Sequence, residues 1–594
     1  MPVYSPSRRF STAFLIVGVV TAWLLAGERA DLAQADKPIA SQLVRADEAP
    51  PTRGPWGEWR RYFRGETHGT RDLVVLVVNL KPGQEPHPPH RHAEEEFMIL
   101  AEGSGVWHLD GKEIPSRKGD VLYAAPWAMH GLKNTGAGPL SYYLVKWSGK
   151  GVKAASPPDK MDEAEEQARS WIRTVGGRFR TDLTLASNPV VKVDLEDARI
   201  ADDSLKYLRA FPHLQEVSLA GTEISDAGLE HLAGLANLQE LNLRETAITG
   251  SGLGALARLE RLQMLDLSHC RGLAHLKGLA GLKHLRWLDL GRDKITDQEL
   301  RGLAGLERLE TLILQSAHIT DVTPLAGLRE LRYLYLGQTQ VTDAGLAALA
   351  RLPSLERLQL ELTPITDDGV KHLGGLSRLR MLNLSQTAIT GKALAHLAGL
   401  DSLESLQLQS TRIEDLKSVP PLPGLRYLNL YRAPLDEPGL QGIERLTGLR
   451  SLLLGEAQVT DLKGLSALRE LRHLDLRGTW TNDNGMRVIA GLKQLERLVI
   501  DGTRIADFKL LAGLKRLHFL GMCRMQFTDM DILHLTELRE LRELYLIDTK
   551  ISDVGLTLLV GLNNLHRLVV SGTKVTDDGV SLLQGALPKC RINR

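Results

Sequence analysis

The stretch Leu331-Arg332-Tyr333-Leu334-Tyr335-Leu336-Gly337-Gln338-Thr339 decides the fold of about two-thirds of this chain, because its spacing recurs along the sequence. Leu334 and Leu336 are two residues apart, so on a β-strand both side chains point to the same side. Tyr333 and Tyr335 then face the opposite side. One short strand with a leucine face and a free face is therefore the predicted structural unit.

The Leu-x-x-Leu-x-Leu block of this stretch has 17 starts between Val190 and Leu565, at a mean step of about 23 residues. The repeat length and the order of residues within each repeat resemble the leucine-rich repeat family, whose units contain one strand each. The resemblance implies an α/β solenoid of about 17 repeats over residues 190–594. No unit can bury its leucines alone, so the stack of units is the core.

The residues after each strand predict how a coil closes. Thr339 stands where many members of the repeat family carry Asn or Cys, and its hydroxyl is expected to cap backbone groups of a neighbouring coil. The following segment, residues 341–349, predicts a short helical return on the convex side. Where the step shortens, at residues 321–325 and 461–465, a single tight turn is expected instead.

Residues 53–152 have a different sequence pattern, in which short apolar segments alternate with Gly and Pro. Asp110-Gly111 is a strong sign of a two-residue hairpin turn. Several short strands within about 100 residues favour a small all-β barrel or a double-sheet jelly roll. The expected strands cover residues 73–78, 97–100, 106–109, 121–124 and 142–147.

Two segments separate this region from the repeats. The consecutive prolines Pro157 and Pro158 predict a linker over residues 153–162, because proline interrupts regular structure. The charged stretch from Glu163 to Arg173 predicts a helix. Residues 163–189 are therefore expected to form a helical cap on the solenoid.

Residues 1–35 are interpreted as a targeting segment. Arg8 and Arg9 precede an apolar run of 15 residues from Ala13 to Gly27, shorter than the roughly 20 residues that cross a bilayer. A cleaved signal peptide and an uncleaved membrane anchor both remain open. In either case we expect export to a periplasmic, cell-envelope or extracellular location, with membrane contact only through this segment if it stays uncleaved.

The charge composition excludes one class of partner. The chain has 73 Lys and Arg against 72 Asp and Glu, a formal net charge of +1. Multiple phosphate contacts need a surplus of Lys and Arg, so no nucleic-acid partner is expected. The three cysteines, at positions 270, 523 and 590, are too few and too scattered for a disulfide framework.

The residue types that support metal chemistry lie in the first region. His90 and His92 are two apart, so on one strand both imidazoles project from the same face. Glu96 begins the next expected strand, and His130 arrives from another hairpin. Three neutral imidazoles and one carboxylate suit one divalent transition metal, with Mn, Fe, Ni, Cu and Zn all admissible. The net positive charge of such a site favours a small anionic or oxygenated ligand.

The order and spacing of these residues resemble the two motifs of the cupin superfamily. The first motif, His-x-His-x3-Glu-x6-Gly, is matched at His90, His92, Glu96 and Gly103. The second is matched at Gly119, Pro126, His130 and Asn134. The resemblance implies a cupin barrel over residues 53–152 whose metal ligands are His90, His92, Glu96 and His130.

Two functions remain open. In the first, an exported metalloenzyme acts on a small molecule in the barrel while the repeats hold a protein partner. In the second, the protein is a non-enzymatic receptor or scaffold whose barrel only binds ligand or metal. The sequence does not decide whether the barrel turns over a substrate. If it does, oxygenase, decarboxylase, isomerase and amidohydrolase reactions all remain possible. Glu96 is the candidate catalytic proton shuttle.

Aromatic side chains on the concave repeat face are candidates for partner binding, since aromatic anchors dominate many protein interfaces. The residues concerned are Tyr333, Tyr335, Tyr427 and Tyr431. Tyrosine is also common on strands through β propensity alone. Two further histidines have structural interpretations: His87 as a surface or supporting residue, and His108 as an ordinary strand histidine.

Overall fold

The computed structural model describes residues 49–65, 70–125, 127–149, 163–182, 189–270, 272–435 and 439–594. The predicted targeting segment, the predicted linker and Pro126 of the second motif lie outside these residues. The chain divides into two compact units: residues 1–193 with 210–214, and residues 194–209 with 215–594. Among the described residues, no helix has the length and apolar character to cross a lipid bilayer.

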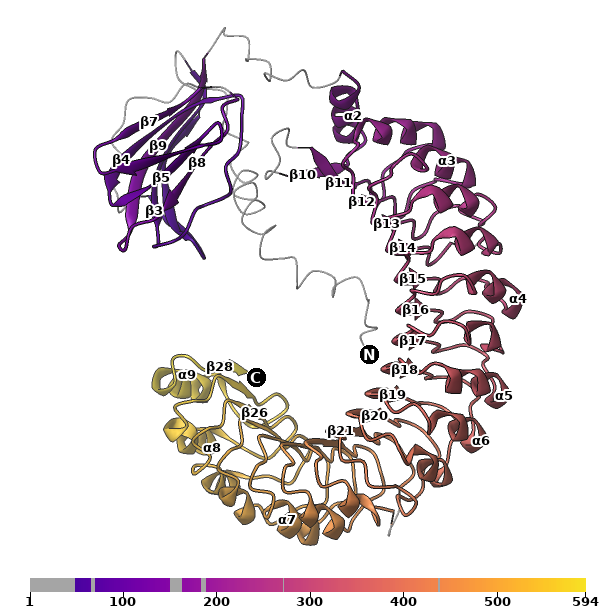
Figure 1. The fold of residues 1–594 in the computed structure, drawn as a ribbon. Coiled ribbons are helices and arrows are strands. Elements are labelled where there is room, and N and C mark those ends of the chain that lie inside the picture. Colours follow the sequence, from indigo (N-terminus) through magenta and orange to yellow (C-terminus); the bar gives the residue numbers. More distant parts are fainter. Residues whose placement is uncertain are drawn as a thin grey trace. The chain divides into compact units, whose positions relative to one another are not determined.

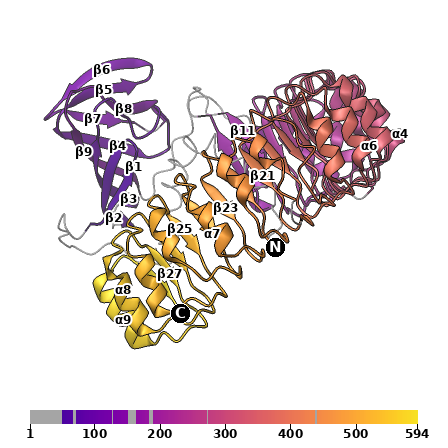
Figure 2. The same cartoon turned by 90° about the horizontal axis from the view of Figure 1, so that it is seen from below.

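The first unit contains two antiparallel sheets, which confirms the predicted barrel or jelly roll (Figures 1 and 2). One sheet has the strand order β1-β2-β3-β9-β4-β7 and the other has the order β6-β5-β8. The strands are β1 (Pro51–Gly54), β2 (Gly57–Gly65), β3 (Thr70–Leu80), β4 (Glu95–Glu102), β5 (Ser104–Leu109), β6 (Lys112–Arg117), β7 (Val121–Ala124), β8 (His130–Asn134) and β9 (Leu140–Gly149).

All five strands expected from the sequence are present, as parts of β3, β4, β5, β7 and β9. The Asp-Gly hairpin is also confirmed, because β5 and β6 pair on either side of it. Asp110 and Gly111 both have positive φ, 47° and 81°, as the tight turns that suit the twist of a hairpin require.

The barrel core lies between the two sheets. Leu100 and Tyr142 come from the larger sheet, and Trp107 and Leu132 from the smaller one. All four side chains are almost completely buried. Because burial of each large apolar side chain contributes about 1.5–3 kcal/mol, this cluster is the main force that holds the sheets together.

A helix and a strand occupy the predicted cap. Helix α2 (Glu163–Thr174) buries Ala168 and Ile172 completely. Strand β10 (Arg178–Thr181) follows it and was not expected from the sequence.

A long sheet forms the repeat region, and its strands follow one another in chain order from β10 to β28. Within the described residues, 17 of these strands, β11 to β27, lie at the predicted repeat starts. Their bounds are β11 (Val190–Asp194), β12 (Glu216–Ser218), β13 (Glu240–Asn242), β14 (Met264–Asp266), β15 (Trp287–Asp289), β16 (Thr311–Ile313), β17 (Tyr333–Tyr335), β18 (Arg357–Gln359), β19 (Met381–Asn383), β20 (Ser405–Gln407), β21 (Tyr427–Asn429), β22 (Ser451–Leu453), β23 (His473–Asp475), β24 (Arg497–Val499), β25 (Phe519–Gly521), β26 (Glu543–Tyr545) and β27 (Arg567–Val569). Strand β28 (Arg591–Asn593) follows the last of them.

The strands line the concave side of the solenoid and the helices lie on its convex side (Figure 1). The central leucines are in register: Leu334 of β17 pairs with Leu312 of β16 and Leu358 of β18, and all three are fully buried. The convex α-helices are α3 (Leu229–Leu232), α4 (Asp297–Leu300), α5 (Asp343–Leu346), α6 (Asp367–Val370), α7 (Asp483–Ile489), α8 (Asp553–Leu558) and α9 (Asp577–Ala586). In the two shortened coils the return is a single 3₁₀ helix, at Thr323–Leu325 and Lys463–Ala467.

Where a threonine follows the strand, it closes its own coil. The Thr339 hydroxyl donates to the carbonyl of Leu336 at 2.7 Å, and Thr363 bonds Leu360 in the same way at 2.6 Å. The expectation that Thr339 caps a neighbouring coil is therefore wrong. The tight turn after the strand places the hydroxyl within reach of the carbonyl three residues earlier.

An aspartate at the start of many helical returns makes the polar connection between coils. Asp297 accepts hydrogen bonds from the backbone N–H and the hydroxyl of Thr320, at 2.8 and 2.5 Å, and from the N–H of Asp321 at 3.1 Å. Burial alone would raise the pKa of Asp297, but these bonds outweigh it and lower the pKa below its usual value. Equivalent bonds are accepted by Asp226, Asp343, Asp367, Asp529 and Asp553.

Asp297→Asn should lower the free energy of unfolding at pH 7 by about 1 kcal/mol, because it removes a charged acceptor from three hydrogen bonds. The folded state lowers the pKa of Asp297, so its contribution is complete above the unfolded pKa of about 3.9 and is lost as pH falls below it. Urea unfolding followed by circular dichroism should therefore show a gap between variant and wild type that closes on acidification. Gln298→Ala, at the exposed neighbouring position, is the control. A gap that widens at low pH contradicts the assignment.

Candidate metal centre

One pair of backbone hydrogen bonds attaches the histidine segment to the barrel. His90 N–H donates to the carbonyl of His130, and His130 N–H donates to the carbonyl of His90, both at 2.9 Å. The expectation that His90 and His92 share a strand is wrong: His90 forms an isolated bridge and His92 lies in an irregular segment. The preceding Pro88 and Pro89 explain this, since proline has no N–H to donate to a sheet.

The other two predicted residues come from different sheets. Glu96 is the second residue of β4 in the larger sheet, and His130 is the first residue of β8 in the smaller sheet. Their side chains are nearly inaccessible to solvent, with Glu96 3% and His130 1% exposed. The site is therefore assembled between the two sheets, near one end of the buried core.

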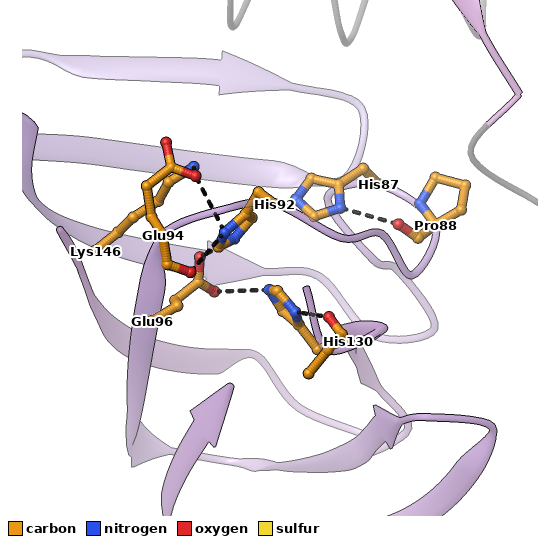
Figure 3. A network of polar contacts seen from close by, with 8 residues as sticks. His87, Pro88, His92, Glu94, Glu96, His130 and Lys146 are labelled. Atoms are coloured by element: carbon orange, nitrogen blue, oxygen red, sulfur yellow. Dashed lines mark hydrogen bonds and ion pairs between the residues drawn. The ribbon is translucent and has the colours of Figure 1, made fainter. Parts of the chain in front are cut away.

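The structure brings the four predicted side chains together, and Figure 3 shows three of them, His92, Glu96 and His130. His90, His92 and His130 each offer one ring nitrogen, and these nitrogens lie within 4.8 Å of one another. Glu96 lies against two of the three histidines: Oε2 is 3.0 Å from His92 Nε2, and Oε1 is 3.6 Å from His130 Nε2.

Three buried polar atoms of this cluster have no hydrogen-bond partner in the described part of the chain: His90 Nδ1, Glu96 Oε1 and His130 Nε2. Each such atom costs about 1–3 kcal/mol. His130 Nδ1 lies 2.8 Å from the carbonyl of Ala128, which can only accept, so Nδ1 carries the proton and Nε2 keeps its lone pair. A divalent cation bound between these atoms would satisfy all three, and imidazole with carboxylate fits a first-row transition metal.

His92 is oriented by Glu94. Its Nδ1 lies 3.0 Å from the backbone carbonyl of Glu94 and 3.3 Å from the Glu94 side chain, whose carboxylate also pairs with Lys146 at 3.6 Å. With the proton on Nδ1, the Nε2 lone pair faces Glu96 Oε2 at 3.0 Å. Two such atoms repel at this distance unless a proton or a cation lies with them. This contact also fits a cation site.

The electrostatic setting keeps His90 and Glu96 in ligand form, and it favours the protonated ring of His92 until a cation takes the place of that proton. Burial, reinforced by neighbouring imidazoles, lowers the pKa of His90 to about 2, so that its ring is neutral. Burial would raise the pKa of Glu96, but the contacts with His130 and His92 outweigh it and lower the pKa, so the carboxylate is ionised. Burial also opposes charge on His92, yet its contacts with Glu94 and Glu96 raise its pKa. The bond from His92 lowers the pKa of Glu94 to about 2.

His87 lies closer to the site than its sequence position suggested. Its ring meets the His90 ring edge-on, with centroids 4.1 Å apart, and its Nδ1 is 3.1 Å from the carbonyl of Pro88. Burial lowers the pKa of the His87 imidazole. His87 is not a member of the three-histidine group, so it supports the His90 ring. The only sequence sign of this role was its place three residues before His90.

Two other residues singled out from the sequence have structural roles. His108 lies in β5 and pairs with Glu113 at 3.7 Å, away from the histidine group. Asn134, the last residue of the second motif, is fully buried and donates to the carbonyls of Leu80 and Gly138 at 3.1 and 2.9 Å. Asn134 therefore ties β8 to the chain segments beside it.

The first pair of candidate partner-binding tyrosines lies on the concave face. Tyr333 and Tyr335 are the first and third residues of β17 and are half-buried. The guanidinium groups of Arg332 and Arg357 lie 5.5 and 5.8 Å from the Tyr333 ring. Arg357 also donates to the Tyr335 hydroxyl at 3.5 Å. The Tyr333 ring thus has two cations beside it, and the Tyr335 hydroxyl is held by one of them.

The two tyrosines of the second pair lie in different kinds of local structure. Tyr427 is the first residue of β21, whereas Tyr431 lies in the turn beyond this strand. The Tyr431 hydroxyl donates to Glu456. Three strands, β18 to β20, separate β17 from β21, so the two pairs form separate surfaces.

The geometry defines a jelly-roll domain with a cluster of metal-ligand type, joined to a repeat solenoid. The family profile described as "Cupin domain" matches residues 76–146. Profiles described as leucine-rich repeats match residues 249–436, 212–271 and 561–583. The chain therefore belongs to the cupin superfamily through its N-terminal domain, which is fused to a leucine-rich repeat region.

Three curated relatives align with the cupin domain. Gentisate 1,2-dioxygenase of a Streptomyces species is 35% identical over 81 residues, 14% of this chain, and the match spans only 22% of that enzyme. Dimethylsulfoniopropionate lyase DddW of Ruegeria pomeroyi is 35% identical over 107 residues, covering 17% of this chain and 68% of the lyase. An oxalate-binding protein of Thermotoga maritima is 27% identical over 110 residues, covering 17% of this chain and 91% of that protein.

Solved structures resemble the repeat region. A leucine-rich repeat protein of Leptospira interrogans is 21% identical and covers 67% of this chain and 95% of its own, with a TM-score of 0.49. An internalin of Listeria monocytogenes is 24% identical and covers 62% of this chain and 96% of its own, with a TM-score of 0.45.

Glu94→Gln should weaken the affinity of the site for a divalent metal by about tenfold, because residues that orient a ligating histidine typically contribute that much. Titration of the metal against a competing chelator measures the change. Glu95→Gln is the matched control, since Glu95 contacts the Tyr123 hydroxyl at 3.4 Å and not the histidines. Equal losses in the two variants, or none in Glu94→Gln, would show that Glu94 does not orient His92.

Proposed function

We propose that the cupin domain is a mononuclear metal site that binds a small carboxylate and acts on it. The observation that carries this proposal is the set of three buried, unpartnered donor atoms on His90, Glu96 and His130. The substrates or ligands named for the three relatives, gentisate, dimethylsulfoniopropionate and oxalate, are all carboxylates. A dication that faces one ionised Glu leaves a net positive charge, which attracts such an anion.

Each residue has a stated part in this proposal. His90, His92, Glu96 and His130 are the candidate metal ligands, and the bound metal would supply Lewis acidity to a coordinated oxygen. The Ala128 carbonyl and Glu94 fix the tautomers of His130 and His92. Glu96 is buried and ionised, so it can accept a proton at Oε1 as well as hold the metal. The apolar core beneath the site limits access of water from that side.

Binding without turnover is the second candidate function. It is favoured by the relative named as an oxalate-binding protein, because the match spans 91% of that protein. In this version the cupin domain senses or sequesters the carboxylate. In both versions we place the protein outside the cytoplasm, on the pattern of its first 35 residues, and a protein partner on the concave face.

Purified wild-type protein should hold close to one divalent transition metal per chain, and His92→Ala should lose most of it, since one of three imidazole donors is removed. Metal analysis by mass spectrometry gives the content directly. His108→Ala should retain the metal, because His108 lies in β5 outside the cluster. If wild type holds no more metal than His92→Ala, the metal site is excluded.

Calorimetric titration with oxalate and with gentisate then separates binding from turnover. Heat of binding in the metal-loaded wild type that is absent in His92→Ala supports carboxylate recognition. Loss of the carboxylate over time, followed by chromatography, supports an enzyme. Binding with no loss favours the receptor version, and neither binding nor loss removes small carboxylates as the ligand class.

Tyr333→Ser combined with Tyr335→Ser should weaken capture of a protein partner several-fold, because aromatic anchors contribute about 2 kcal/mol or more when they are hot spots. Capture by immobilised full-length protein, quantified by mass spectrometry against wild type, measures this. Tyr62→Ser in β2 of the cupin domain is the control. Unchanged capture by the double variant removes this pair from the interface.

A further inference from the structure

The last strands of the solenoid carry a second concave surface that contains no proposed partner residue. Arg497 begins β24, Arg567 begins β27 and Arg591 begins β28, and all three are exposed. Phe519 of β25 and Tyr545 of β26 lie between the first two arginines. We name these five residues the Arg–aromatic patch.

The patch has a continuous stacked arrangement. The Arg497 guanidinium lies 3.6 Å from the centroid of the Phe519 ring. The Phe519 and Tyr545 rings are 5.1 Å apart, and the Arg567 guanidinium lies 5.4 Å from the Tyr545 ring. Two cations therefore enclose two aromatic rings across four neighbouring strands.

The floor beside these rings is low. The third residues of β24, β25 and β27 are Val499, Gly521 and Val569, and all three are buried. A Cβ atom at Gly521 would lie 3.0 Å from the Asp501 carboxylate, 3.3 Å from Val499 and 3.6 Å from the Phe519 ring, so these side chains already fill the space above Gly521. The apolar contact that the patch offers to a partner is therefore the two rings themselves.

The arginines of the patch lack acidic partners, unlike several other arginines along the solenoid. Elsewhere Arg332 pairs with Glu356, Arg380 with Glu404, Arg432 with Glu456 and Arg472 with Glu496. Across the described residues, Arg497, Arg567 and Arg591 form no ion pair within 4.0 Å. The nearby Glu543 instead accepts a hydrogen bond from the Tyr545 hydroxyl at 3.0 Å.

From this combination we propose that the Arg–aromatic patch binds an acidic peptide segment of a protein partner, one that alternates carboxylate with aromatic or aliphatic side chains. A guanidinium that stacks on a ring uses its flat face, so its N–H groups remain free in the plane to bind a carboxylate. Arg and aromatic residues are also the types that dominate binding energy at interfaces. Both halves of the recognition, charge and apolar contact, are thus present.

Charge favours a peptide over a single-stranded nucleic acid. Three guanidinium groups share the surface with Glu543, and the chain as a whole has a formal charge of only +1. Nucleic-acid grooves combine stacking with a long run of basic residues that follows the backbone. The patch shares no residue with β17 or with the metal site, so it depends neither on the tyrosine surface nor on the metal.

The test uses the full-length protein and a short fluorescein-labelled peptide in which Glu alternates with Phe and Leu. Fluorescence anisotropy at moderate salt should show saturable binding that weakens as salt rises. The double variant Arg497→Glu with Arg567→Glu should lower the affinity by more than tenfold, since it reverses both flanking charges. Arg357→Glu is the matched control, because Arg357 occupies the same position of β18 beside Tyr333.

Several results would contradict the proposed binding of an acidic peptide. No binding of the peptide to wild type overturns the proposal, as does an equal loss in Arg357→Glu. Equal binding of a peptide with Lys in place of Glu also overturns it, and tighter binding of an oligothymidylate would assign the patch to nucleic acid instead. Arg497→Gln alone, checked for native circular dichroism, keeps the test valid if the double variant does not fold, and should still lower the affinity several-fold.

Discussion

The chemistry of the N-terminal domain depends on the two backbone hydrogen bonds that join His90 to His130. The prolines before His90 prevent a regular strand there, so these bonds, together with the bond from the Trp127 N–H to the His92 carbonyl, hold the histidine segment in place. They hold imidazole and carboxylate donors together even though three of the buried atoms lack partners. A fold that maintains this unfavourable arrangement is prepared for a cation, because the cation would offset the cost of the unpaired atoms.

The convex and concave sides of the repeat region have different roles. Leucines fill the interior of every coil, and no coil is stable without its neighbours. On the convex side, aspartates such as Asp297 and Asp343 connect each coil to the next through threonine. On the concave side, the first and third residues of most strands face away from the leucines, although some, such as Val499 and Asn383, are buried by their neighbours. The sequence can therefore vary at these positions without loss of the fold. Both the tyrosine pairs and the Arg–aromatic patch lie among these variable positions or next to them.

Local patterns predicted much of the cupin domain, and their failures have identifiable causes. Strands rich in apolar residues, such as Val121–Ala124, were recognised, whereas Gly57–Gly65 was missed because it has charged residues and glycine at both ends. His130–Asn134 was missed because four polar or small residues around one leucine give no clear alternation. The spacing of the four candidate ligands was sufficient to group them. The supporting role of Glu94 was not predicted, and that of His87 was one of two alternatives, since both depend on how the segment folds back on itself.

The sequence by itself determined the period of the leucines, the jelly-roll character of the first region and the identity of the four candidate metal ligands. These features follow from side-chain direction along one backbone, which has a fixed period on a strand. Only the tertiary structure decided which lone pairs have no partner, that Thr339 bonds its own coil, and which arginines lack an acid. Pairing depends on distances between strands and coils that are set by packing, and those distances have no local signature in the chain.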